Sequence, residues 1–336
     1  MLERKDNKPQ CGKKSVRHRS IDIFRGITIV LMVFFTILSR LAYVPESLDH
    51  NEFGKIHLGD FVLTMFLFVS GMSIVFFREK RKNRKTGEYV LDVIERLGML
   101  VMIAIVLSPF SAGEILGMDE VMLNAVLFIP ALILIIFPEW SVFLVAGSVF
   151  AAYFILGSVS MLPDFRAHYL GGYAAAIFYL PVMLGGAMAG KRLVEGKNLD
   201  MLLALWAVTS LVLLLVIPAY KMTASPSFMA VSVALSLAFF YIIREAEAAG
   251  KLAGRISEKI EYLGRKPIRY WTLMFVLLVG PLTVYMAYMD SRFPIGMDWL
   301  AAVAVSLLCV PLLYISSKGV DILEDLVKAR LKKFRA

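Results

Sequence analysis

A short polar stretch between two long apolar segments holds the residues best suited to chemistry. Asp49, His50 and Glu52 come first, and Asp60 follows ten residues after His50. A carboxylate beside an imidazole fixes its tautomer and raises its basicity, which suits a general base or a nucleophile. Ionisable groups at membrane depth cost free energy, so those close to apolar segments are first interpreted as functional. This stretch is therefore the first candidate for a reaction site.

A second histidine, His57, competes with His50 for this role. Loop histidines are commonly only solvated polar residues, but both of these have carboxylates near them in the sequence. His57 lies three residues before Asp60, so a local cap or hydrogen bond would explain it without chemistry. The residues alone leave the choice between the two histidines open.

Long apolar runs dominate the chain. Of its 336 residues 59% are hydrophobic and the mean hydropathy is +0.71, whereas a soluble domain is nearer half apolar. The runs approach the roughly 20 residues that an α-helix needs to cross a bilayer. We expect an all-α, polytopic integral membrane bundle of about ten transmembrane helices. The expected spans are residues 23–43, 58–77, 90–108, 121–137, 140–157, 173–190, 202–219, 228–243, 269–289 and 298–316.

Basic residues gather in alternate connections between these spans. The two terminal tails and the loops 78–89, 191–197 and 244–269 carry 29 of the 36 Lys and Arg residues. Because basic loops stay in the cytoplasm, both termini are predicted to be cytoplasmic and the His50 loop extracytoplasmic. Membrane topology thus accounts for the net charge of +9, without nucleic acid as a partner. A multi-pass protein of the cell membrane is expected.

The two ends of the chain differ from its membrane region. Residues 1–20 form a basic tail without the features of a cleaved secretory signal. Residues 318–336 combine Lys and Arg with apolar residues at helical spacing, a pattern typical of an interfacial helix on anionic lipid. Residues 21–317 are expected to form one transmembrane domain. Neither cysteine has metal-ligand spacing to histidine, so no metal site is predicted.

A second charged group begins the first apolar segment. Asp22 and Arg25 are three residues apart, hence on one face of a helix, where they can pair. One interpretation is an ion pair at the membrane edge, with the arginine reaching toward water. The other is a guanidinium held ready for a cytoplasmic phosphate group, which its planar fork binds through two hydrogen bonds. Arg96 lies just inside the third span on the same side.

The segments around these residues resemble a known family. Arg19–Ile27 reads R-S-I-D-I-F-R-G-I, and Asp60–Gly71 reads D-F-V-L-T-M-F-L-F-V-S-G. With a histidine ten residues before Asp60, this order is similar to the start of the heparan-alpha-glucosaminide N-acetyltransferase family, one of a broader group of transmembrane acyltransferases. The resemblance singles out His50 over His57 as the catalytic histidine, with Asp60 as its partner. Weaker similarities follow in the same order at Glu95–Gly98, Met183–Gly186 and Leu263–Pro267.

The resemblance implies an integral-membrane acyltransferase. Its donor would be acetyl-CoA or another acyl-CoA from the cytoplasm, and its acceptor an amine or hydroxyl of a glycan or amino sugar on the extracytoplasmic side. His50 would act as a general base or as a transient acyl carrier, held by Asp60. Arg25, oriented by Asp22, would bind the CoA phosphates, with Arg96 as a further candidate. Membrane lipid is the other expected partner, and a homodimer stays open.

Departures from the family pattern leave two alternatives. Thr64 and Met65 stand where the family pattern has a Pro-Trp pair, and Met274 stands where that pattern often has a polar residue. These differences concern the identity of the acceptor more than the type of reaction. A transporter or flippase of a small or lipid-linked solute would place ionisable residues inside several spans. The spans between residues 121 and 243 carry almost none away from their ends. A membrane scaffold without catalysis has only Met274 in its favour.

Small residues also predict how the spans pack. Gly186 and Gly190 are four residues apart within one apolar span. Such pairs let membrane helices approach closely, so this span is expected to pack tightly against a neighbour.

Overall fold

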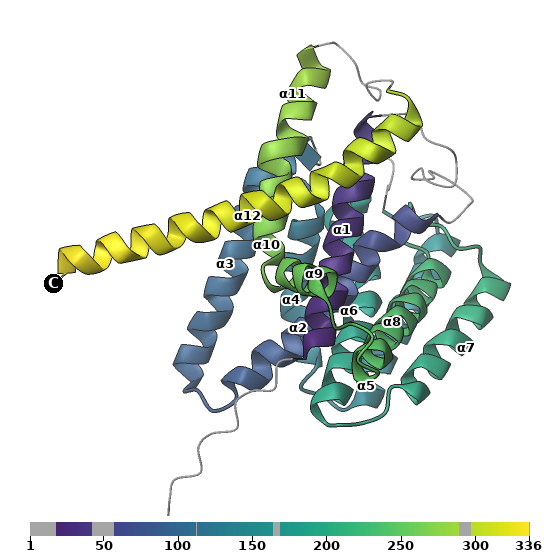
Figure 1. Cartoon of the computed structure of the whole chain (residues 1–336). Helices are drawn as coiled ribbons and strands as arrows, with labels where there is room; N and C mark the ends of the chain where they lie inside the picture. Colours follow the sequence, from purple (N-terminus) through teal and green to yellow (C-terminus); the bar gives the residue numbers. More distant parts are fainter. Residues whose placement is uncertain (1–17, 42–56, 112, 164–168, 289–296, 336) are drawn as a thin grey trace, which may run out of the picture.

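Helices make up most of the chain, and its described residues contain no strand. The computed structural model describes residues 18–41, 57–111, 113–163, 169–288 and 297–335 (Figure 1). Its elements are α1 (Arg19–Leu41), η2 (Leu58–Asp60), α2 (Phe61–Arg81), α3 (Thr86–Ser111), α4 (Glu120–Leu134), α5 (Glu139–Ser158), η3 (Tyr169–Gly171), α6 (Gly172–Val194), α7 (Asp200–Val216), α8 (Pro226–Ala248), α9 (Arg255–Arg265), α10 (Pro267–Met274), the π-helical turn η4 (Phe275–Val279), α11 (Gly280–Tyr288) and α12 (Trp299–Arg335). The predicted all-α bundle is confirmed.

The predicted spans can be compared with these helices one by one. Each span coincides with a helical segment, the ninth with α10, η4 and α11 together. Seven segments of the described chain are long and apolar enough to cross a membrane, and α4 and α7 are shorter apolar helices. A helical membrane protein is therefore shown, while the count of ten crossings and the side of the termini stay predictions.

Polar side chains fix where α4 and α8 begin. Asp119 accepts a hydrogen bond from the backbone N–H of Met122 at 2.6 Å. Ser225 accepts one from the N–H of Phe228 at 3.3 Å, and Pro226 occupies the first turn of α8. The first N–H groups of a helix have no partner inside it, so a capping oxygen or a proline stabilises the start. Both helices therefore start at positions that their own sequence determines.

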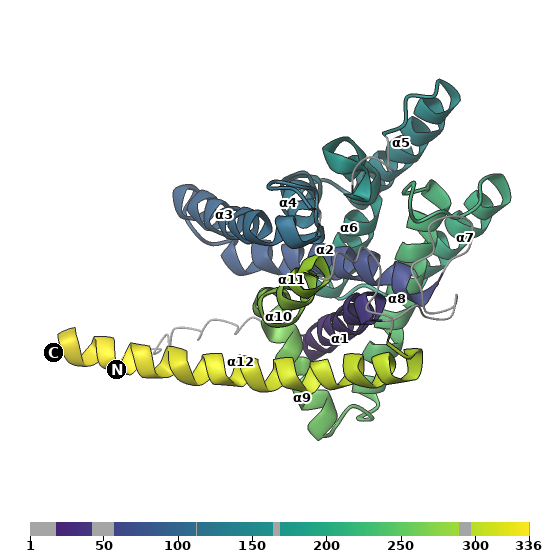
Figure 2. The same ribbon diagram turned by 90° about the horizontal axis from the view of Figure 1, so that it is seen from above.

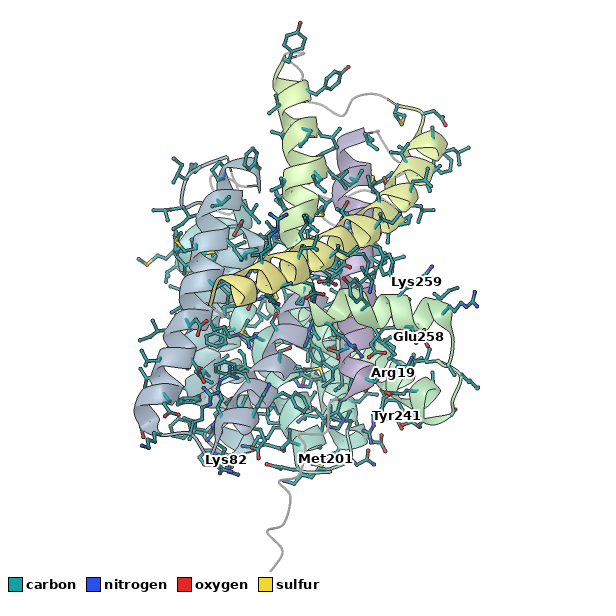
Figure 3. All side chains as sticks on the ribbon, turned by 60° about the vertical axis from the view of Figure 1, so that its left-hand side comes forward. Arg19, Lys82, Met201, Tyr241, Glu258 and Lys259 are labelled. Carbon is teal, nitrogen blue, oxygen red and sulfur yellow. The ribbon has the colours of Figure 1, made fainter. Side chains whose placement is uncertain are left out.

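From α1 to α8, successive helices run in alternating directions (Figure 1), which gives the bundle two distinct ends. Lys82 after α2, Met201 at the start of α7 and Tyr241 in the last third of α8 lie toward one end (Figure 3). We call this the basic end, because it also carries the basic connection after α2. The opposite end, where Asp60 leads into α2, is called the Asp60 end.

Glycines bring α2 and α6 into close contact at the centre of the bundle. A Cβ atom on Gly186 would overlap the backbone oxygen of Phe68, and one on Gly71 would overlap that of Met183. Gly190 lies almost as tightly against the α2 backbone. The packing expected from Gly186 and Gly190 is confirmed, and it fixes the helix that follows Asp60. In Figure 2, α5 and α7 lie toward the outside of this centre.

The charged helix α9 packs against the first half of α1. A Cβ atom on Gly26 would overlap the α9 backbone, and one on Gly264 would overlap the backbone oxygen of Asp22. Arg19 adds an ion pair to Glu261 at 2.8 Å, and Figure 3 shows Arg19 beside α9. The first and the last of the segments that resemble the family are therefore packed against each other.

The last helix, α12, is continuous across the predicted boundary at residue 318. Asp321 pairs with Lys266 and Arg269, which ties α12 to the start of α10. Beyond this tie the helix extends away from the bundle (Figures 1 and 2). Its exposed apolar side chains there are Ile322, Leu323, Leu326 and Val327. That residues 318–336 form a separate interfacial tail on lipid stays a prediction.

Candidate functional site

Asp60 is the most deeply buried of the predicted site residues that the structure describes. It ends the short turn η2, leads into α2, and is 1% exposed. Its Oδ2 accepts a hydrogen bond from the backbone N–H of His57 at 2.9 Å. Its Oδ1 lies 3.0 Å from Nζ of Lys221. The backbone of His57 and the ammonium of Lys221 thus both help to hold the Asp60 carboxylate.

Of the two histidines in this stretch, the structure describes His57. His57 is 9% exposed and makes the local hydrogen bond to Asp60 that its spacing suggested, through its backbone. His50 lies outside the described residues, as do Asp49 and Glu52. The pairing of His50 with Asp60 therefore stays a prediction from the sequence.

Lys221 is the residue of this site that the sequence interpretation missed. It lies 161 positions after Asp60, in the connection between α7 and α8. A signal was present, because only five basic residues fall on the predicted extracytoplasmic side of the spans, and Lys221 is one of them. A rare cation on the side of the candidate carboxylates could have been weighed as their partner.

The connection that carries Lys221 is held by its own hydrogen bonds. The hydroxyl of Ser225 accepts the N–H of Tyr220 at 2.9 Å, and that of Ser227 donates to the carbonyl of Pro218 at 2.9 Å. The N–H of Ala224 closes a turn on the carbonyl of Lys221 at 2.9 Å. The ammonium of Lys221 is thus presented from a fixed backbone. 

Aromatic and polar contacts then join this connection and α4 to α2. The ring of Phe61, next to Asp60, stacks on Phe228 of α8 with 5.4 Å between centroids. Asn124 of α4 donates a hydrogen bond to Ser70 of α2 at 2.8 Å. The helix that follows Asp60 is therefore held by helices far apart in the sequence.

Asp22 and Arg25 form the predicted pair, at 3.2 Å between Oδ1 and Nη1. The same nitrogen donates to the carbonyl oxygen of Gly264 at 2.8 Å, and Nη2 donates to the hydroxyl of Ser73 at 2.6 Å. The guanidinium thus links α1 to α2 and to the end of α9. This geometry agrees with the structural interpretation of Arg25, and its contact with a phosphate stays a proposal.

Arg96 has a different environment from Arg25. Its guanidinium lies over the rings of Phe77 and Phe128, at 4.9 and 5.3 Å from their centroids. Within the described parts of the chain, no carboxylate or hydrogen-bond acceptor meets it, and the charges that act on it are those of Arg25 and Arg81. A partly buried cation among other cations favours an anion beside it. Of the residues predicted to bind acetyl-CoA, Arg96 is therefore the one whose N–H groups meet no acceptor among the described residues.

A polar cavity opens at the basic end. It has a volume of about 360 Å³ and lies between the last turns of α2 and α6 and the end of α4. Its lining includes Arg78, Lys82 and Lys191, together with Glu79 and Glu195. Among the described residues no carboxylate pairs with Arg78, whereas Lys82 lies 3.8 Å from Glu79. Cations therefore gather around the last turns of α2, where a phosphate-bearing ligand could be held.

Comparison with known proteins agrees with the geometry. No curated protein matches the chain. Residues 17–217, more than half of the chain, match the family described as heparan-alpha-glucosaminide N-acetyltransferase, catalytic. The match includes the residues expected to carry the chemistry and every helix from α1 to α7. The chain therefore belongs to the heparan-alpha-glucosaminide N-acetyltransferase family, whose catalytic region is that of a transmembrane acetyltransferase.

Proposed function

We propose that this protein moves an acetyl or other acyl group from acyl-CoA on the cytoplasmic side of the cell membrane to a sugar-type acceptor on the opposite side. The acceptor contributes an amine or a hydroxyl. The observation that supports this most is Asp60, a buried carboxylate at the head of a membrane helix, ten residues after His50. The family match supplies the class of reaction.

His50 is the proposed catalytic group, acting in one of two ways. As a general base, its neutral imidazole takes the proton of the acceptor while the acceptor attacks the thioester carbonyl. The carbon–sulfur bond then breaks, and the imidazolium returns the proton to the CoA thiolate. As an acyl carrier, the imidazole itself attacks the thioester carbonyl, the carbon–sulfur bond breaks, and the departing CoA thiolate takes the proton of the acyl-imidazolium. The neutral acyl-imidazole then passes its acyl group to the acceptor, and the imidazole that is released takes up the proton that the acceptor loses.

Asp60 is the proposed partner of this histidine in both routes. An ionised carboxylate accepts a hydrogen bond from one ring nitrogen, which leaves the other nitrogen free to react, and stabilises the imidazolium that forms. The backbone N–H of His57 and the ammonium of Lys221 also contact the Asp60 carboxylate and help to fix it at the start of α2.

The donor is proposed to bind by its phosphates near the basic end. Arg96 is the proposed direct contact, because its donors meet no acceptor in the described chain and its neighbouring charges are positive. Arg25 is proposed to add a fixed positive charge nearby, in the orientation that Asp22 and Ser73 give it. The bound phosphates would relieve the repulsion among these arginines.

Turnover of radiolabelled acetyl-CoA by the purified protein in liposomes, with a panel of amino sugars, tests the proposal. We expect transfer of label by the wild type and its loss in His50→Ala. His57→Ala is the matched control, because the hydrogen bond from residue 57 to Asp60 uses the backbone N–H. Equal turnover in wild type and His50→Ala, or no binding of acetyl-CoA to the wild type, would refute the proposal and favour a transporter.

A further inference from the structure

We propose that Lys221 is a positioning residue of the acyl transfer, holding Asp60 ionised and in place so that Asp60 can orient the catalytic imidazole. The inference rests on the proposed function. It adds a residue that lies beyond residues 17–217, the part of the chain that matches the family.

The ion pair between Asp60 and Lys221 is largely buried. The side chain of Asp60 is 0% exposed and that of Lys221 is 20% exposed, with 3.0 Å between their charged atoms. A buried carboxylate without a cation beside it tends to take up a proton, since water no longer stabilises its charge. The ammonium of Lys221 therefore favours the ionised form of Asp60.

The ionisation state of Asp60 determines what it can do for the reaction. A carboxylate can only accept hydrogen bonds, whereas a carboxylic acid carries a proton on one of its oxygens. Only the ionised form of Asp60 stabilises the positive charge that an imidazole gains when it takes a proton. Neutralising Asp60 would therefore slow the chemical step rather than weaken the binding of acetyl-CoA at the basic end.

Hydrogen bonds fix the backbone from which Lys221 reaches Asp60. The turn from Lys221 to Ala224 and the two serine hydroxyls of the connection hold the chain on either side of Lys221. The stacking of Phe61 on Phe228 sets the start of α8 against the start of α2. The backbone that carries Lys221 is thus held close to the start of the helix that follows Asp60.

An ion pair of purely structural importance is the competing explanation. It would join the connection between α7 and α8 to α2, and its loss would lower the amount of folded protein. It would not make the turnover of the folded protein depend on an added amine. The two explanations therefore differ in a kinetic measurement on folded protein.

The test uses the full chain in liposomes with the variants Lys221→Ala and Lys221→Arg, and with ethylammonium added to the alanine variant. Removing a group that orients a catalytic residue costs roughly 10- to 100-fold in activity. We expect kcat of Lys221→Ala to fall by about that factor with KM for acetyl-CoA within about twofold, because only the transition state is affected. Ethylammonium is expected to restore kcat with saturation, and Lys221→Arg to retain part of it.

The matched control is Lys197→Ala. Lys197 also pairs with a carboxylate, that of Glu195 at 2.6 Å, but its side chain is 59% exposed and lies at the other end of the bundle. Its removal is expected to leave kcat unchanged. Wild-type kcat in Lys221→Ala, or a loss that follows the folded fraction and does not respond to ethylammonium, would overturn the inference alone. Absence of turnover in the wild type would instead remove the proposed function on which it rests.

Discussion

Replacing Arg96 with methionine should weaken acetyl-CoA binding without unfolding the protein. In the proposal the guanidinium donates one charge-assisted hydrogen bond or a bidentate pair to a CoA phosphate. A hydrogen bond to a charged group contributes about 1.5–3 kcal/mol, so losing one should raise the Kd of acetyl-CoA by about 10- to 150-fold. Equilibrium binding of radiolabelled acetyl-CoA to the detergent-solubilised protein measures this change.

The thermal stability of the same variant should change little. Arg96→Met removes the contacts of the guanidinium with Phe77 and Phe128, each worth about 0.5–1 kcal/mol where water is near. It also removes the repulsion from Arg25 and Arg81, and methionine fills part of the space with apolar atoms. The opposing terms should leave the free energy of unfolding within about 1 kcal/mol of the wild type.

Two other arginines serve as controls for this experiment. Arg84 lies on the same end, is half exposed, and pairs with Asp92 at 2.7 Å, so Arg84→Met should leave the Kd within about twofold because exposed charges are screened. Arg192 pairs with Glu139 at 2.8 Å. Arg192→Met should lower the free energy of unfolding by about 1–3 kcal/mol, because the Glu139 carboxylate loses this ion pair. Unchanged acetyl-CoA affinity in Arg96→Met, or the same loss in Arg84→Met, would refute the role of Arg96.

Two further predictions concern stability. Gly186→Ala should destabilise the protein by about 1–3 kcal/mol, because its Cβ atom would overlap the α2 backbone. Gly147→Ala should not, because a Cβ atom there meets open space. Thermal unfolding in detergent compares the two variants, and equal unfolding midpoints would contradict the close packing of α6 on α2. Burial alone would raise the pKa of the Glu261 carboxyl, but hydrogen bonds and charges from Arg19 and Arg265 outweigh it, so the pKa lies below its usual 4.5. A carboxyl whose pKa is lowered by folding stabilises the protein at pH values above its unfolded pKa, and this stability is lost as the pH falls through its folded pKa. Glu261→Gln should therefore flatten the acid side of the plot of unfolding free energy against pH. An unaltered plot would contradict the pairing of Glu261 with Arg19 and Arg265.

Local sequence patterns were sufficient for features that depend on neighbouring residues. Apolar runs predicted where helices lie, since a membrane helix must be long and apolar. The spacing of Asp22 and Arg25 predicted their contact, because residues three apart share a helix face. Gly186 and Gly190 predicted a close approach between helices, although not that α2 would be the partner.

Contacts that depend on tertiary packing could not be predicted from local sequence patterns. Arg25 was expected to have donors available for a phosphate, yet two of its partners, Ser73 and Gly264, come from other helices. Lys221 meets Asp60 only because the turn before α8 is folded against the start of α2. Neither partner choice follows from spacing, since the residues involved are separated by whole helices.

Acyl transfer across a membrane can be measured in sealed liposomes that carry radiolabelled acetyl-CoA outside and an amino sugar inside. We expect labelled N-acetylated sugar to accumulate inside vesicles whose protein has its basic end outward, while CoA is released outside. His50→Ala vesicles should show neither product. Label that enters the vesicles as intact acetyl-CoA, or acetylated sugar that forms only when donor and acceptor share one side, would contradict it.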